Sequence, residues 1–118
     1  MSKTIRVVRL VPGQMPEVAT ISAGLNSLQS EVGGNIEVVG LDKGVDAYVN
    51  EEGLLIGLPF NCHLPSAFAG GRMVPVVGTI ILASHDEEGE TVSLTDEQVG
   101  YWQATLASLR VGRPLARA

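Results

Sequence analysis

The sequence has few of the residues on which secretion, membrane insertion and covalent catalysis depend. It contains one cysteine and two histidines among 118 residues, and only 4% of its residues are aromatic. A single cysteine excludes an internal disulfide, which agrees with a reducing compartment, so we predict a cytoplasmic protein. Arg6 and Arg9 interrupt the first apolar stretch, and the longest one, residues 74–83, is about half of what a membrane-spanning helix needs. We therefore predict neither a signal peptide nor contact with a membrane.

Basic residues are also scarce. Eight lysines and arginines stand against thirteen acidic residues, which gives a net charge of −5. Proteins that bind nucleic acid usually carry a basic face, so this balance argues against that class. The length and the 45% hydrophobic content predict one globular domain over residues 1–118, with a flexible tail at about residues 112–118.

The spacing of apolar residues predicts an α+β fold with a mostly antiparallel sheet. An antiparallel hairpin and a short helix are expected first, at residues 5–11, 17–22 and 24–32. Three strands that form a β-meander core are expected next, at residues 36–41, 45–50 and 54–58. They precede an irregular loop at about residues 59–75, a fully apolar strand at residues 76–83 that we expect to be buried on both faces, and a short strand at residues 91–94.

A longer helix near the C-terminus has the clearest sequence signals. Thr95 and Gln98 form a capping box, in which each residue bonds the backbone of the other. Trp102 belongs to the apolar stripe of this helix and is predicted to lie in the core, whereas Tyr101 lies off the stripe and is a candidate for an exposed contact. We expect both helices to cover one face of the sheet.

The few chemically reactive residues do not follow a known catalytic or metal-binding pattern. Cys62 and His63 are adjacent, and neighbours in an extended chain point in opposite directions, so a hydrolase or transferase built around Cys62 ranks last among our hypotheses. His63, His85 and Cys62 lack the spacing of a zinc site. The sequence predicts no metal and no cofactor.

The segment Ala69-Gly70-Gly71-Arg72 is the best candidate for binding a small anionic ligand. Backbone amides and the guanidinium of Arg72 together could hold a phosphate. The segment lacks the strand, lysine and helix that make a phosphate-binding loop specific, so an anionic nucleotide is the second of our functional hypotheses.

Residues 33–61 and two later segments resemble a known family. The residues that carry the resemblance are GGNIEVVGLDKGVDAYVNEEGLLIGLPFN, followed by VVGTIIL and SLTDEQ. They are similar to domain-of-unknown-function family 3846, whose members are small proteins common in phages, plasmids and other bacterial mobile elements. The resemblance implies a mobile-element origin and an accessory role, and it supplies no catalytic residues.

The first functional hypothesis is therefore a non-enzymatic accessory protein that binds a host or phage protein. If the predicted meander is correct, polar residues gather on loops at one of its ends, which is a plausible binding surface: Asn50, Glu51, Glu52 and Asn61. Arg72 and Tyr101 complete the set of candidate binding residues. The exposed flank of the last helix and the edge strands also predict a homodimer.

Overall fold

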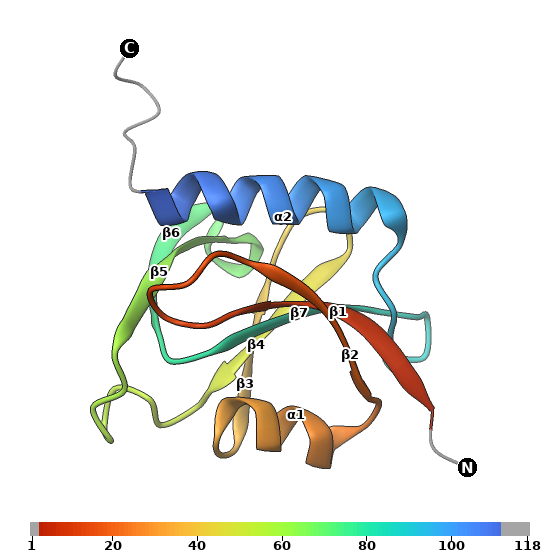
Figure 1. Ribbon diagram of the computed structural model, residues 1–118, viewed down its shortest axis with the longest axis horizontal. Coiled ribbons are helices and arrows are strands. Elements are labelled where there is room, and N and C mark those ends of the chain that lie inside the picture. Colours follow the sequence, from red (N-terminus) through yellow and green to blue (C-terminus); the bar gives the residue numbers. More distant parts are fainter. Residues whose placement is uncertain (1–2, 112–118) are drawn as a thin grey trace.

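Strands dominate the computed structural model, which describes residues 3–111 (Figure 1). Within this range the elements are β1 (Thr4–Leu10), β2 (Glu17–Ser22), α1 (Leu25–Val32), β3 (Ile36–Gly40), β4 (Val45–Asn50), β5 (Phe60–Ser66), the 3₁₀ turn η1 (Ala67–Ala69), β6 (Arg72–Val77), β7 (Ile80–His85), β8 (Thr91–Val92) and α2 (Asp96–Val111). The predicted α+β class, with a short early helix and a longer helix near the C-terminus, is confirmed. The predicted tail at residues 112–118 lies outside the described residues.

The main sheet has the strand order β2-β1-β7-β4-β3, and β8 pairs with the end of β7. Every pairing is antiparallel. The central strand is β7, and its residues Ile80 to Ser84 are all buried, so the prediction of a strand covered on both faces is confirmed for this segment. β5 and β6 form a separate antiparallel hairpin.

The two helices lie on opposite faces of the main sheet, so our prediction that both cover one face is wrong (Figure 1). The cause is visible in β1, where Val8 and Leu10 join the core beneath α2 and the hairpin, while Ile5 and Val7 join the core against α1. Alternate side chains of a strand point to opposite faces, and here both sets are apolar. Each face therefore needs its own cover.

The predicted meander strand at residues 54–58 is instead a turn over Glu51–Gly57. The amide of Ile56 donates to the carbonyl of Glu52 over 3.0 Å, and the amide of Leu58 donates to the carbonyl of Gly53 over 2.9 Å. Gly57 closes the turn with a φ of 73°, in the left-handed region that suits glycine. These local bonds override the strand preference of the Leu-Leu-Ile run.

The prediction of an irregular loop at residues 59–75 is also wrong, because this segment forms the β5–β6 hairpin. Two features hide the strand period in the sequence. The pairing register shifts between Phe60 and Cys62, so two successive residues, Asn61 and Cys62, are buried. Pro65 and Pro75 also stand inside the strands, where proline is tolerated at an edge.

The predicted strand at residues 76–83 divides into the end of β6 and the start of β7. Gly78 separates them with a φ of 80°, and a Cβ at this position would lie 2.7 Å from Cδ1 of Leu58. The hairpin therefore folds back over the main sheet at Gly78, a bend that the apolar sequence VVGTIIL does not reveal.

Replacing Gly78 with alanine is expected to lower the free energy of unfolding by about 2 kcal/mol or more, because both the positive φ and the contact with Leu58 oppose a side chain. Urea denaturation measures this loss. Gly89→Ala is the matched control, since Gly89 has a φ of 83° but open space around it. Equal losses in the two variants would show that the contact with Leu58 contributes nothing.

No helix among residues 3–111 is both long and apolar enough to cross a membrane.

Candidate functional site

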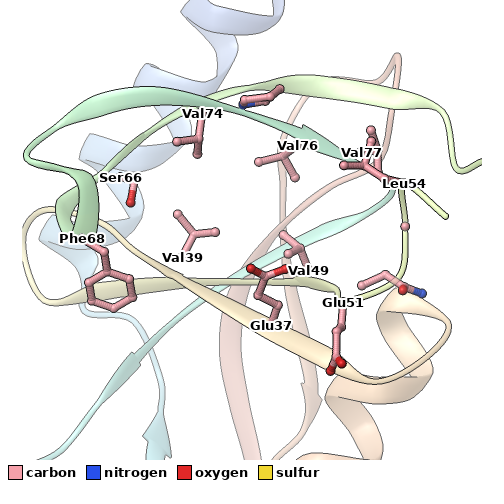
Figure 2. Close-up of a pocket in the computed structure, with 13 residues that line it drawn as sticks. Glu37, Val39, Val49, Glu51, Leu54, Ser66, Phe68, Val74, Val76 and Val77 are labelled. Atoms are coloured by element: carbon pink, nitrogen blue, oxygen red, sulfur yellow. The ribbon is translucent and has the colours of Figure 1, made fainter.

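An apolar cleft of about 400 Å³ lies between the main sheet and the β5–β6 hairpin (Figure 2). A cavity of this size is within the range of ligand-binding pockets. Its lining comes from β3, β4, the turn that follows β4, the end of β5, η1 and β6: Glu37, Val39, Val49, Asn50, Glu51, Gly53, Leu54, Ser66, Phe68, Val74, Pro75, Val76 and Val77. Figure 2 shows Val39 and Val49 on the sheet side, and Val74 and Val76 on the hairpin side, directed toward the space between them.

The cleft ends at Phe68 on one side and at Leu54 on the other (Figure 2). Phe68 is 75% exposed, although its ring covers Gly40, where a Cβ would lie 2.8 Å from Cε1 of Phe68. The absence of a side chain at Gly40 thus lets the η1 turn approach β3. The aromatic ring remains available to a ligand from the solvent side.

Leu54, Leu55 and Ile56 form the apolar tip, a name we keep for these three residues. Their exposed fractions are 81%, 85% and 58%. The tip is held in place from within the turn, because the side-chain oxygen of Asn50 accepts a hydrogen bond from the amide of Glu52 over 2.7 Å. A fixed turn that exposes three successive aliphatic side chains is unusual for a surface without a partner.

Among residues 3–111, the charged groups that line the cleft are all acidic. Glu37 and Glu51 carry carboxylates at its mouth (Figure 2), and no lysine, arginine or histidine of this range belongs to the lining. Glu52 is exposed in the adjoining turn. The cleft therefore favours an apolar ligand with positive charge and disfavours an anion.

The structure separates the polar residues that we expected to form one surface. Asn50 and Glu51 line the cleft and Glu52 adjoins it, but Asn50 is only 6% exposed. Its side-chain amide donates to the carbonyl of Val32 over 3.1 Å, which ties the end of β4 to α1. Asn50 thus shapes the turn that carries the apolar tip, and its side chain serves mainly these internal hydrogen bonds.

Asn61 lies inside the protein and not on the predicted polar surface. It is 2% exposed, and its side-chain amide donates to the carbonyls of Leu10 over 2.9 Å and Gly78 over 2.7 Å. Arg110 of α2 donates to both the backbone and the side-chain oxygen of Asn61. Asn61 therefore joins β1, the β5–β6 hairpin and α2, which is a structural role.

Arg72 begins β6 and does not line the cleft. The amides proposed to hold a phosphate beside it are already bonded, because Gly70 donates to the carbonyl of Ala67 and Gly71 to that of Ser66 over 2.7 Å. The prediction that an anion binds at this segment therefore rests on the exposed guanidinium alone.

Tyr101 is 42% exposed on α2, as expected for a residue off the apolar stripe. Its ring packs edge-on against Trp102, and the amine of Lys43 lies 4.7 Å from its centre, within the range of a cation–π contact. Tyr101 lines a different hollow, together with Lys43 and Gln98, so the structure does not bring it to the cleft.

A family model described as "Domain of unknown function (DUF3846)" matches residues 5–107. The chain belongs to this family. No curated protein and no solved structure matches it. The predicted resemblance is confirmed, and the match spans both cores and every element from β1 to most of α2.

Cys62 and His63 of this DUF3846 protein point in different directions, as neighbours in β5 should. Cys62 is 5% exposed in the core, whereas His63 is exposed and its ring lies 5.2 Å from that of Phe60. Burial raises the pKa of the Cys62 thiol to about 11, against a smaller opposing effect of the Arg110 charge. A thiol in this environment is a weak nucleophile near neutral pH.

The stability of the DUF3846 domain should therefore fall as the pH rises from about 9 to about 11, partly because of Cys62. The thiol stays protonated in the folded state over this interval but ionises in the unfolded chain, which favours unfolding. Urea denaturation at several pH values measures the effect. The curve for Cys62→Ala should decline less steeply than that for the natural protein, and parallel curves would contradict the assignment.

The remaining polar groups of residues 3–111 do not form a recognisable reactive centre. Nδ1 of His85 lies 2.7 Å from a carboxylate oxygen of Asp46, and the neighbouring Ser84 hydroxyl donates to the carbonyl of Gly44. Within residues 3–111, no three histidine, cysteine, aspartate or glutamate side chains lie close enough to hold a metal ion.

Sequence reasoning missed the apolar tip and Phe68, the two most exposed parts of the site. A signal for the tip was present, since Gly53 and Gly57 bracket Leu54 to Ile56 at a spacing typical of a turn. We interpreted the same residues as a strand because aliphatic side chains favour strands. For Phe68 the sequence holds no comparable signal.

Proposed function

We propose that this DUF3846 protein is a non-enzymatic accessory protein of phage or mobile-element type that binds a host or phage protein. The binding surface consists of the apolar tip and the adjoining cleft. The observation that carries the proposal is the exposure of three successive aliphatic side chains on a turn that is fixed by its own hydrogen bonds. Exposed apolar patches of this kind mark sites of protein interaction.

The magnitude of the hydrophobic effect supports this assignment. Full burial of one Leu or Ile side chain contributes about 1.5 to 3 kcal/mol. The tip could thus provide several kcal/mol toward binding, and because the turn is already ordered, little conformational entropy is lost when a partner covers it. Phe68 adds an exposed aromatic ring at the far end of the cleft, and aromatic residues are enriched in interfaces.

The charges of the site favour a partner with basic residues. Glu37 and Glu51 line the cleft, Glu52 is exposed in the adjoining turn, and the protein as a whole carries a net charge of −5. Lysine or arginine side chains at the edge of the partner's apolar contact would be attracted, whereas acidic partners would be repelled. Binding of an anionic nucleotide in this cleft is disfavoured for the same reason.

Leu55→Asp is expected to abolish partner binding while leaving the free energy of unfolding within about 0.5 kcal/mol, because Leu55 is 85% exposed. The measurement is quantitative capture from bacterial lysate, with and without phage infection, followed by binding assays on each purified candidate. Leu25→Asp is the matched control, since Leu25 is 56% exposed on α1 at the opposite face of the sheet.

A partner that binds the natural protein and Leu25→Asp, but not Leu55→Asp, is the expected result. If every bound protein is retained by Leu55→Asp, the tip is not the docking surface. The homodimer stays a separate prediction, and a mass of 12.4 kDa in light scattering would refute it.

A further inference from the structure

β3 is an edge strand of the main sheet, and within residues 3–111 no backbone group pairs with its outer amides and carbonyls. Two backbone hydrogen bonds just beyond the ends of β3 show which of its residues bond to β4. The amide of Leu41 donates to the carbonyl of Val45, and the amide of Glu51 donates to the carbonyl of Asn35. Hydrogen-bonded pairs alternate along an antiparallel ladder. Residues 37 and 39 therefore bond to β4, and Ile36 and Val38 direct their amides and carbonyls away from the sheet.

The open part of this edge adjoins the apolar cleft. Glu37 and Val39 of β3 line the cleft, and Phe68 covers the edge at Gly40, so Ile36 to Val39 remain accessible. β2, the edge strand on the other side of the sheet, contributes no residue to the cleft. β6 lines the opposite wall, but its Pro75 has no N–H to donate.

The volume of the cleft favours an extended ligand over a helical one. From helix dimensions, one turn with its side chains occupies about 400 Å³, so the cleft would hold a single turn at most. An extended chain placed along β3 keeps its backbone outside the cleft and inserts only alternate side chains. Unpaired strand edges are also the usual template for such an addition.

We propose that an extended segment of the partner protein adds to the free edge of β3 as a further strand. The segment bonds to the amides and carbonyls of Ile36 and Val38. Its cleft-facing positions carry an apolar side chain against Val39 and Phe68, and a lysine or arginine beside Glu37. This inference rests on the proposed function and specifies the chemical class and conformation of the partner at the same site.

Val38→Pro tests the strand addition directly. Proline removes the outward N–H of residue 38 and places its ring at the free edge, while the bonds of residues 37 and 39 to β4 remain. Val38→Thr is the matched control because threonine is β-branched and keeps the N–H. Thermal unfolding of both variants verifies that the ladder with β4 is intact.

The probe is a phage-displayed library of short random peptides, selected on the natural protein, with synthetic copies of the enriched sequences. We expect the enriched peptides to carry an apolar and a basic residue two positions apart, on the same face of an extended chain. They should bind at least about tenfold more weakly to Val38→Pro than to Val38→Thr. We also expect slower amide hydrogen exchange at Ile36 and Val38 upon binding, which a helix in the cleft would not cause.

The outcomes distinguish this inference from the proposed function. Peptides that fail to bind Leu55→Asp but bind Val38→Pro normally support docking at the tip and overturn strand addition. Peptides that leave amide hydrogen exchange at Ile36 and Val38 unchanged have the same meaning. Enriched peptides whose apolar residues follow a helical spacing also overturn strand addition. A second copy of this chain bound along β3, in place of a different protein, overturns it too. If no peptide is enriched but a protein partner requires Leu55, the proposal of strand addition is rejected and the proposal of docking at the apolar tip is retained.

Discussion

Replacing Trp102 with alanine is expected to lower the free energy of unfolding by about 3 to 5 kcal/mol. Trp102 is 1% exposed and is a member of the core cluster between the main sheet, α2 and the β5–β6 hairpin. Its indole N–H also donates to the carbonyl of Asp42 over 3.3 Å, which ties α2 to the β3–β4 connection. Small domains have about 5 to 15 kcal/mol of stability, so this loss is a large fraction of the total.

Urea denaturation measures the effect, and Tyr101→Ala is the control. Tyr101 is the adjacent residue and is also aromatic, but it is 42% exposed, so we expect a loss below about 1 kcal/mol. If Trp102→Ala fails to fold, Trp102→Phe retains most of the buried area and lowers the loss to a measurable range. Similar losses for Tyr101→Ala and Trp102→Ala would contradict the assignment of Trp102 to the core.

Asn61→Ala should cost about 3 kcal/mol, the second-largest effect that we expect. The substitution removes three hydrogen bonds: the two that the Asn61 amide donates to the carbonyls of Leu10 and Gly78, and the one that its side-chain oxygen accepts from Arg110. A net contribution of about 1 kcal/mol for each of the three bonds gives this magnitude. Urea denaturation again provides the measurement.

Two further variants separate the parts of this network. Asn61→Asp keeps an oxygen for Arg110 but loses both donors, so it should remain clearly destabilised. Asn35→Ala is the control at an exposed asparagine whose side-chain oxygen accepts from Gln29, and its cost should be within about 0.5 kcal/mol. A small loss in Asn61→Ala would mean that water replaces the amide.

Asn61 and Trp102 matter for function because they position the hairpin that forms one wall of the cleft. Arg110 near the end of α2 bonds to Asn61 in β5 and to the carbonyls of Val11 and Gln14 after β1. Val76 of β6 belongs to the same core cluster as Trp102 and also lines the cleft. Loss of either residue should thus weaken partner binding indirectly, unlike Leu55→Asp, which leaves the fold intact.

The sequence by itself determined the elements whose signals are local. The capping box at Thr95 and Gln98 is present, with bonds of 2.9 Å and 3.1 Å in the two directions. The first hairpin, both helices and the strand at residues 45–50 were also predicted within about a residue or two of their positions. Caps, turns and alternating apolar residues depend on neighbours a few positions away, so they can be identified without a fold.

Only the tertiary structure decided which surfaces meet, and with them the candidate site. Leu54 to Ile56 have the same composition as a buried strand, and only the bonds among Asn50, Gly53 and Leu58 turn them outward. Likewise, the sequence predicts Asn61 on the surface, but in the structure Asn61 bonds to Leu10 and Arg110, which are both about 50 positions away along the chain. Contacts between residues so distant in sequence depend on how the sheet and hairpin pack, and no local pattern encodes that packing.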